Sequence, residues 1–596
     1  MKKKSKGLFI IGWVMMVLFS ISAIGMAEDA PALLLKQDIR TIINGLDTSI
    51  PALMEKARVP GLQIALVRDG KIVWQKGFGV KNINGHDPVT TDTIFEAASF
   101  TKPFFAYVVM KLVEENVLDL DTPLIKYLPR EGIEQNMGHS LDEPGFHKEW
   151  FEKITARHVL SHSSGLPHGE GGRPYPIFFA PGSKYKYSAD GYVYLQKTIE
   201  YLKGEKLDVI MKKYVLDPLG MTHSCMVWRE DYEKTAANGH GYFGKPEAFR
   251  KRTEANSAAS LYTTAGDYTR FVCAVMAGEG LKKETLDLML TPQIDVDKDK
   301  GLAWSLGFGL QTDSNGKAFW QWGDYGIFRN YIIAYPQQRL AVVYLTNSFY
   351  GLSICQEIVG GSIGGLAMGN RFLGYKPYNY PVYDFARKVY EQGAEVVEKQ
   401  FAEVKAKYPD DFGPETVSLL ADAFLNEKLY DTAIAFYRFN VREAPQSAQA
   451  LCELARAYLQ KGDKADRAEA LSCYKKAKEV YKVYKDEKFD IKTIDWDLAY
   501  MQALDNPKQL PADYLNSLTG DYGPRHIKFE NGRLYYFRDN GTLPDYAPMI
   551  AMEKDTFVIE GLVNFRFKFE FDDQGHPVRI VGIFDAGQLD PTPRNK

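Results

Sequence analysis

The pattern of apolar and polar residues predicts a mixed α and β domain over residues 28–375. Two runs rich in β-forming residues, 62–67 and 71–78, flank an Asp69-Gly70 pair, a combination that predicts a hairpin. Helical patterns dominate the middle of this region, and strand patterns return at 304–310, 318–322, 328–335 and 340–347. We therefore expect distant parts of the chain to build one sheet that is flanked by helices.

The pattern changes twice after residue 375. Residues 384–506 are helical in pattern and contain a repeat: Ala421, Ala423, Phe424 and Leu425 recur 34 residues later as Ala455, Ala457, Tyr458 and Leu459. This resembles the tetratricopeptide repeat, whose small alanines let paired helices approach closely. Residues 511–596 alternate apolar with polar positions, which predicts a small antiparallel β domain. For the helical segment, a protein partner and a plain spacer role both stay open.

Composition and charge describe a soluble globular protein with more than one domain. The 596 residues are 45% hydrophobic and 25% charged, and this length exceeds what a single core usually organises. The net charge of -3 is spread along the chain without a basic stripe, so we expect no nucleic-acid partner. The five cysteines lack a C-x-x-C spacing and the histidines lack a His-Glu-x-x-His motif. We therefore predict no disulfide framework, no metal site and no cofactor.

The first residues have the composition of an export signal. Lys2, Lys3, Lys4 and Lys6 precede an uncharged apolar run at 7–26, and Gly25-Met26-Ala27 offers small residues where a signal peptidase cleaves. We predict a signal peptide at 1–27 and a periplasmic or extracellular protein. A run of this length also fits an uncleaved membrane anchor.

A Ser-x-x-Lys tetrad, Ser99-Phe100-Thr101-Lys102, is the first candidate for chemistry. The same pattern occurs at Ser183, Ser314 and Ser472, but the tetrad at Ser99 is followed by apolar residues spaced as one buried face of a helix. We expect Ser99 to open this helix and Lys102 to lie one turn further along the same side. A hydroxyl would then lie beside an amine that can deprotonate it.

Four stretches place this tetrad in a known context. They are FEAASFTKPF at 95–104, HVLSHSSGLP at 158–167, PGSKYKYSADGYVYLQ at 181–196 and FWQWGDYGIFRN at 319–330. In these residues and their order the chain resembles the serine β-lactamase and penicillin-binding-protein superfamily, in its class C, esterase and D-aminopeptidase-like branch. The resemblance covers most of residues 35–370 and implies an antiparallel sheet flanked by helices.

The resemblance also implies roles for individual residues. It makes Tyr187 the partner of Lys102; a phenol beside an ammonium ionises more easily, so the pair would take the proton from Ser99 and return it to the leaving group. It places Gln321 and Gly323 on the strand that forms one wall of the active site, Gln321 bonding substrate and Gly323 allowing close approach. The amides of Ser99 and Asp324 would form the oxyanion hole.

Two departures from the superfamily bear on the substrate. Gln321 is uncharged where relatives hold a cation or an imidazole, and Ala189 replaces an asparagine that many relatives use to hold the substrate amide. His162, in the second stretch, is expected to be structural because no Gly-x-Ser-x-Gly elbow accompanies it.

These observations lead to one prediction and two alternatives. We predict an exported serine hydrolase that forms an acyl-enzyme on Ser99, with Lys102 and Tyr187 as base and acid, acting on a small-molecule or peptide acyl substrate as an esterase or peptidase of altered specificity. The alternatives are a β-lactamase or D-Ala-D-Ala carboxypeptidase, and a binding module with weak catalysis.

Overall fold

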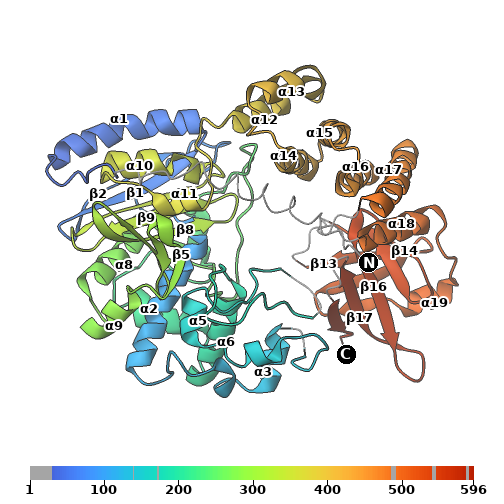
Figure 1. Ribbon diagram of the computed structural model, residues 1–596. Coiled ribbons are helices and arrows are strands. Elements are labelled where there is room, and N and C mark those ends of the chain that lie inside the picture. Colours follow the sequence, from blue (N-terminus) through green and yellow to red (C-terminus); the bar gives the residue numbers. More distant parts are fainter. Residues whose placement is uncertain are drawn as a thin grey trace, which may run out of the picture. The chain divides into compact units, whose positions relative to one another are not determined.

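A computed structural model describes residues 30–137, 140–170, 174–484, 491–539, 545–584 and 589–595 (Figure 1). The predicted signal peptide lies outside these residues. The chain forms two compact units: the first holds residues up to Leu118, Lys206–Gly239 and Ala248–Tyr375, and the second holds Asp119–Glu205, His240–Glu247 and the residues from Lys376 onward. The division into domains at 28–375, 384–506 and 511–596 stays a prediction.

The first unit contains an eight-stranded sheet, and both ends of the unit's sequence contribute to it. Its order is β2-β1-β10-β9-β8-β7-β6-β5, and its strand pairs are antiparallel. The predicted hairpin is confirmed, because Arg68 pairs with Lys71 across Asp69 and Gly70, which both have positive φ. β1 pairs with β10, so the expectation of one sheet from distant segments is also confirmed. The strands are β1 (Gly61–Arg68), β2 (Lys71–Gly79), β5 (Ile294–Asp297), β6 (Leu302–Trp304), β7 (Gly309–Asp313), β8 (Gly316–Asp324), β9 (Arg329–Tyr335) and β10 (Leu340–Thr346).

Helices lie on both faces of this sheet, as the strand burial requires. β10 is buried at every position and β1 at all but its last, the pattern of strands covered on two sides. α1 (Ile39–Ala57) packs against α10 (Cys355–Ser362) and β2, while α8 (Ala265–Ala277) packs against β1 and β10 (Figure 1). The other α-helices among the described residues of this unit are α2 (Thr101–Glu114), α7 (Leu207–Met211), α9 (Lys283–Met289) and α11 (Met368–Phe372).

One predicted strand is wrong: residues 304–310 contain a turn. β6 ends at Trp304 and β7 begins at Gly309, and between them Ser305 donates its backbone N–H to the Phe308 carbonyl at 2.9 Å. Gly307 adopts φ of +109°, and a Cβ built there would lie 2.5 Å from the Cβ of Ala106 on α2. Packing against a helix therefore fixes a turn that the apolar run conceals.

The second unit contains the helices that follow Leu118 and those that follow Tyr375. The first group includes α3 (Arg130–Met137), α5 (Ala156–Leu160) and α6 (Asp190–Lys203). The later helices form antiparallel pairs around buried alanines and aromatics; Ala421, Ala433, Ala455 and Ala470 have no exposed surface. Their identity as tetratricopeptide repeats stays a prediction. They are α12 (Pro381–Gln392), α13 (Glu395–Lys407), α14 (Pro414–Asn426), α15 (Tyr430–Glu443), α16 (Ala448–Lys461), α17 (Lys464–Val483) and α18 (Lys492–Asp505).

The predicted C-terminal β domain is confirmed as an eight-stranded antiparallel sheet in sequential order, preceded by α19 (Ala512–Ser517). Trp496 of α18 joins it to the helical segment, donating its indole N–H to the Val563 carbonyl at 2.7 Å and stacking under the Arg566 guanidinium. The strands are β11 (Gly520–Tyr522), β12 (Arg525–Glu530), β13 (Arg533–Arg538), β14 (Ala547–Ala551), β15 (Thr556–Ile559), β16 (Leu562–Phe571), β17 (Pro577–Phe584) and β18 (Leu589–Pro593).

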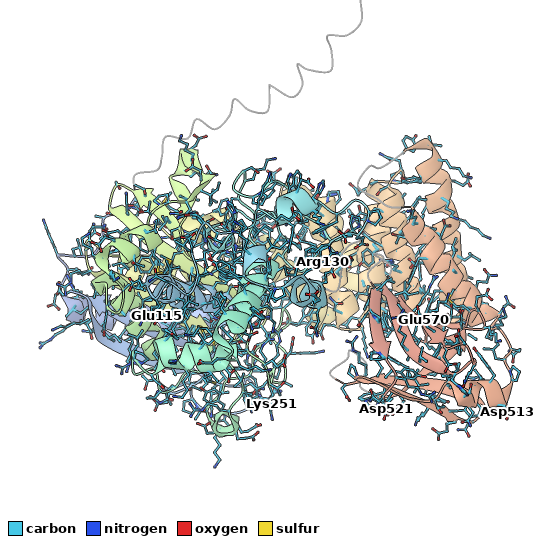
Figure 2. The ribbon with its side chains drawn as sticks, turned by 90° about the horizontal axis from the view of Figure 1, so that it is seen from below. Glu115, Arg130, Lys251, Asp513, Asp521 and Glu570 are labelled. Carbon is cyan, nitrogen blue, oxygen red and sulfur yellow. The ribbon has the colours of Figure 1, made fainter. Side chains whose placement is uncertain are left out.

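Charged side chains of both signs are interspersed over the described surface (Figure 2). Arg130 pairs with Glu134 and Asp142, and Glu570 pairs with Arg579. In the first unit, Glu115 accepts a hydrogen bond from the Tyr214 hydroxyl at 2.7 Å. Among the described residues, no helix is both long and apolar enough to cross a membrane.

Candidate active site

Ser99 lies in a short 3-10 turn, η1 (Ala98–Phe100), that leads directly into α2. The helix itself begins at Thr101, two residues later than predicted, because the Ser99 turn closes with its own bonds: Phe100 donates to the Ala97 carbonyl, and the Thr101 hydroxyl to the Ala98 carbonyl at 2.7 Å. Ala98 is buried and holds φ of +49°, a left-handed conformation that costs a residue with a Cβ about 1–3 kcal/mol. Strain of this kind beside a hydroxyl is common where the fold presents a reactive group.

Lys102 contacts Ser99 as the tetrad predicted. Its Nζ donates to the Ser99 Oγ at 3.1 Å and to the Ala258 carbonyl at 2.9 Å. The Lys102 side chain is buried, whereas Ser99 is half-buried. A buried amine within hydrogen-bond reach of a partly exposed hydroxyl is the geometry that a nucleophile and its base require.

A second tetrad in the chain shows how specific this contact is. The Ser183 hydroxyl donates to the Ala180 carbonyl at 2.6 Å, while the Lys186 Nζ binds a Glu170 carboxylate oxygen at 2.7 Å. Ser183 is exposed, and the side chains of Ser183 and Lys186 each bond a different residue. The same four-residue pattern therefore yields a candidate nucleophile only where the fold buries the lysine.

Strand β8 lies beside Ser99, and two of its predicted residues meet the turn that carries Ser99. Gln321 is fully buried and donates its Nε2 to the Ser99 carbonyl at 2.9 Å. A Cβ added to Gly323 would lie 2.3 Å from the Ala97 carbonyl oxygen, so this glycine lets β8 touch the turn itself. Gln321 thus holds the backbone of Ser99; a direct bond from its side chain to substrate stays a prediction.

The backbone ladder aims the Asp324 amide away from β9. Tyr325 donates its N–H to the Phe328 carbonyl, and Asp324 pairs with Arg329, so the hydrogen-bonded positions on this side of β8 are 325 and 323. Because the amides of an antiparallel strand point alternately to its two sides, the amide of Asp324 points to the side of β8 opposite β9. The neighbour on that side is β7, whose pairing with β8 goes no further than Gly309 with Trp320, so β7 does not reach Asp324. The Asp324 carboxylate is occupied by Arg329, Gly326 and the Tyr375 hydroxyl. The amide orientation fits an oxyanion donor, a role that stays a prediction.

Sequence reasoning missed a third segment of the site, residues 256–262. Besides the Ala258 carbonyl that accepts from Lys102, Leu261 accepts from the Ala97 N–H at 2.8 Å and donates to the Thr101 hydroxyl at 3.0 Å. The run Ala255-Asn256-Ser257-Ala258-Ala259-Ser260 was the available signal, since small residues allow such close backbone approach. Asn330 was missed too; it donates to the Glu96 carbonyl at 3.1 Å and accepts from the Thr346 N–H.

Tyr187 belongs to the second unit, and its pairing with Lys102 stays a prediction. Its ring lies 4.1 Å from the imidazole of His162, centroid to centroid. His162 is fully buried and its Nδ1 accepts the Ser188 N–H at 3.1 Å, so the ring is neutral at that nitrogen and holds the backbone next to Tyr187. Desolvation raises the pKa of Tyr185 and of Tyr192, and negative charge on Tyr187 raises both further.

The loop that carries His162 forms several hydrogen bonds with the segment that contains Tyr187. The carbonyl of Ser163 accepts from Gly182 at 2.8 Å and that of His162 from Lys186 at 2.9 Å. Ser188 donates its hydroxyl to the Pro167 carbonyl and accepts from the Gly191 N–H, which fixes the start of α6. Ala189 stands at the N-cap of α6, without a side-chain hydrogen bond.

Comparison with known proteins decides the family. The family model described as Beta-lactamase matches residues 46–354, about half of the chain. The chain belongs to the beta-lactamase family. Its relatives include the esterase EstB of Burkholderia gladioli, 26% identical over 52% of this chain and 92% of EstB. Penicillin-binding protein 4* of Bacillus subtilis (strain 168) is 24% identical over 56% of this chain and 77% of its own length.

A solved structure is also similar to this chain. The octameric penicillin-binding protein homologue from Pyrococcus abyssi is 19% identical and covers 92% of this chain and 99% of its own, with a TM-score of 0.45. Together with its relatives, the family membership makes this chain a hydrolase-type protein of the β-lactamase and penicillin-binding-protein superfamily.

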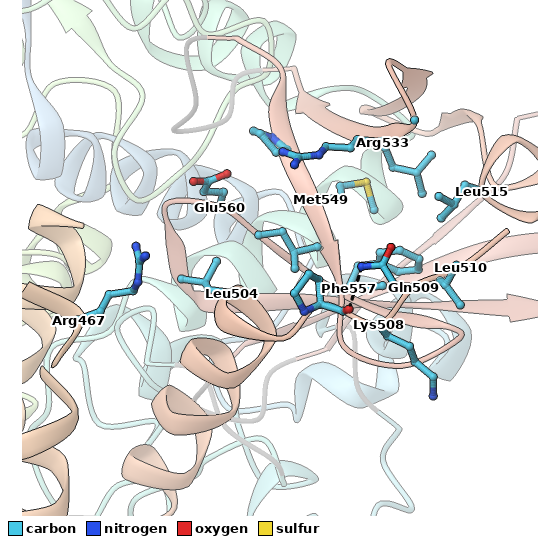
Figure 3. A pocket seen from close by; sticks show the side chains of 16 residues that line it. Arg467, Leu504, Lys508, Gln509, Leu510, Leu515, Arg533, Met549, Phe557 and Glu560 are labelled. Atoms are coloured by element: carbon cyan, nitrogen blue, oxygen red, sulfur yellow. Dashed lines mark hydrogen bonds between the residues drawn. The ribbon is translucent and has the colours of Figure 1, made fainter. Parts of the chain in front are cut away.

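The second unit contains a pocket of its own. A pocket of about 380 Å³ opens between the end of α18 and the sheet of the β domain, with Arg467, Arg533 and Glu560 among its lining residues (Figure 3). It contains none of the residues predicted for catalysis. Among the residues that the structure describes, no group of three or more His, Cys, Asp or Glu side chains could hold a metal ion.

Proposed function

We propose that this member of the beta-lactamase family is an exported serine hydrolase that forms an acyl-enzyme on Ser99. One observation carries the proposal: the buried Lys102 Nζ lies 3.1 Å from the Ser99 Oγ, on a turn that Gln321 and the strained Ala98 hold in place. The named esterase among the relatives supports the same reaction class.

The proposed reaction has two steps. Ser99 Oγ attacks the carbonyl carbon of the substrate while its proton passes to Lys102, with Tyr187 as the partner that delivers a proton to the leaving group. The amides of Ser99 and Asp324 hold the negative oxygen of the tetrahedral intermediate, which collapses to the ester on Ser99 as the leaving group departs. Water or another nucleophile then attacks this ester and gives up a proton, which the Lys102 and Tyr187 pair passes to the Ser99 Oγ as the acyl product leaves.

The substrate is an ester or peptide in preference to a β-lactam or a D-alanyl peptide. Gln321 carries no charge to neutralise a substrate carboxylate, and its amide nitrogen is engaged with the Ser99 carbonyl. Ala189 offers no side-chain hydrogen bond to a substrate amide. Hydrolysis of nitrocefin or of a D-alanyl-D-alanine peptide faster than of simple esters would support the alternative that the relationship to penicillin-binding protein 4* suggests.

The deciding experiment is covalent labelling followed by intact mass measurement. Purified protein is treated with a fluorophosphonate beside Ser99→Ala and the matched control Ser183→Ala, which removes the hydroxyl of a second tetrad. We expect one adduct in wild type and in Ser183→Ala, and none in Ser99→Ala. An adduct on folded Ser99→Ala would place the nucleophile elsewhere, and no adduct on folded wild type would favour a binding module.

Export is a separate part of the proposal. It rests on the lysines and the apolar run of the first 27 residues, which a signal peptidase would remove after Ala27. N-terminal sequencing of protein from the culture medium and cell fractions tests it. A mature chain that begins at Glu28 supports cleavage, whereas membrane-bound protein that retains Met1 supports the anchor.

A further inference from the structure

A short loop between two segments of the first unit belongs structurally to the second. Residues His240–Glu247 group with the helical segment, although Gly239 before them and Ala248 after them belong to the first unit. The loop closes on itself: His240 bridges Pro246, Gly241 donates to the Lys245 carbonyl at 3.0 Å, and Gly244 turns the chain with φ of +78°. Tyr242 and Phe243 therefore stand at the tip of a closed turn.

The tip is held between two helices of the helical segment. Phe243 stacks on Tyr390 of α12, with ring centroids 4.4 Å apart and planes 12° from parallel, and it contacts Phe424 of α14 at 4.8 Å. Tyr242 meets the edge of Tyr383. These apolar contacts alone would not fix the position of the tip along the two helices, because stacked rings can slide past one another.

An ion pair fixes that position. Lys245 is bonded to the Glu427 carboxylate, directly after α14, and the hydrogen bond raises the pKa of Lys245. The face of α12 and α14 formed by Tyr383, Tyr390, Phe424 and Glu427, here called the loop-binding face, thus matches the tip in shape and in charge.

Residues 235–239 lead into this loop and are here called its stem; they are bound to the segments that carry the candidate active site. Ala237 donates to the Ile94 carbonyl at 2.9 Å, and Ile94 donates to the Thr235 carbonyl at 3.1 Å, five residues before Ser99. A Cβ added to Gly239 would lie 2.7 Å from side-chain atoms of Ile327 and Phe328, in the turn that joins β8 to β9. The stem therefore lies against both the approach to Ser99 and the end of the wall strand.

We propose that the loop-binding face is a docking site for residues 240–247 of the same chain, and that the docked tip holds the stem where it supports the Ser99 site. The docking itself is independent of the proposed function, while its effect on Ser99 rests on that function.

Hydrogen exchange measured by mass spectrometry on the full chain tests the docking. The variants are Phe243→Ala, the single reversals Lys245→Glu and Glu427→Lys, and the double reversal that restores the pair. The control reverses an exposed pair of the same kind in the first unit, Lys212 with Asp217. We expect amides of the stem and of Ile94 to exchange about tenfold faster in Phe243→Ala and in each single reversal, and at nearly the wild-type rate in the double reversal and the control. Unchanged exchange in Phe243→Ala and in both single reversals would overturn the docking site.

The rate of fluorophosphonate labelling tests the effect on Ser99. We expect Phe243→Ala to label at least about fivefold more slowly, with wild-type rates in the double reversal and in the control. If Phe243→Ala exchanges its stem amides faster but is labelled at the wild-type rate, the docked tip does not support the Ser99 site, while the docking itself still stands. If wild type is not labelled at all, the proposed hydrolase function fails, and the exchange experiment still decides the docking site.

Discussion

Replacing Gly323 by alanine should damage the Ser99 site without touching any reactive group. The new Cβ would lie 2.3 Å from the Ala97 carbonyl oxygen, against at least 3.4 Å for an ordinary contact, so the two must separate by about 3.4 − 2.3 = 1.1 Å. Asn330 Nδ2, at 3.1 Å, closes the other side. The nearest atom, the Ala97 carbonyl oxygen, belongs to the backbone, which cannot swing away as a flexible side chain does.

The size of the effect follows from that displacement. Moving the Ala97 carbonyl shifts the turn that carries Ser99, and a misplacement of about 1 Å at a reacting group can cost roughly 10²-fold in rate. Overpacking of a tight site costs about 1–3 kcal/mol of folding free energy. We therefore expect Gly323→Ala to slow fluorophosphonate labelling by about 10²-fold and to lower the melting temperature by a few degrees.

The assay compares labelling rates and thermal unfolding of Gly323→Ala, wild type and Gly45→Ala. Gly45 lies on the exposed side of α1 with nothing within 4 Å of its added Cβ, so alanine there should leave labelling unchanged and should stabilise the helix by up to about 1 kcal/mol. Labelling of Gly323→Ala within threefold of wild type, with the same melting temperature, would refute the argument that β8 and the Ser99 turn are locked by this contact.

Three further predictions concern single side chains. Lys102→Met keeps the length of the side chain and removes the ammonium beside Ser99, so labelling should slow by about 10²–10⁴-fold; a wild-type rate would remove Lys102 from the mechanism. His162→Phe keeps a ring beside Tyr187 but leaves the Ser188 amide without its acceptor, which should lower the free energy of unfolding in urea by about 1–3 kcal/mol. His162→Asn can accept through Oδ1 and tolerates the φ of +55°, so it should lose less, and equal losses would contradict this role. The pKa of His526 is raised by hydrogen bonds to Asp521 and Asp539, so its contribution to stability is full below the ordinary histidine pKa of about 6.5 and is lost as pH rises through the higher folded value. Melting curves of wild type and His526→Gln should therefore differ near about pH 5.5, by a few tenths of a kcal/mol for so exposed a cluster, and converge near about pH 9; a gap that does not change with pH would speak against the linkage.

Local sequence determined the elements whose geometry depends on neighbouring residues. Asp69 and Gly70 adopt the positive φ that a two-residue hairpin requires, and Asn531 and Gly532 do the same in the β domain. The contact of Lys102 with Ser99 is also local, because residues three apart on one turn lie on the same side. For these features a window of a few residues contains the whole cause.

The sequence by itself also determined the family, through four motifs in order, and the candidate nucleophile and base. The tertiary structure alone decided what surrounds them: Gln321 binds the Ser99 carbonyl from 222 positions away, Lys102 finds the Ala258 carbonyl, and Phe243 lies between α12 and α14. The turn at Gly307, hidden in an apolar run, was likewise set by Ala106. These contacts depend on how the sheet and the helices pack in three dimensions. A local sequence pattern therefore cannot predict which distant backbone group will lie beside a given side chain.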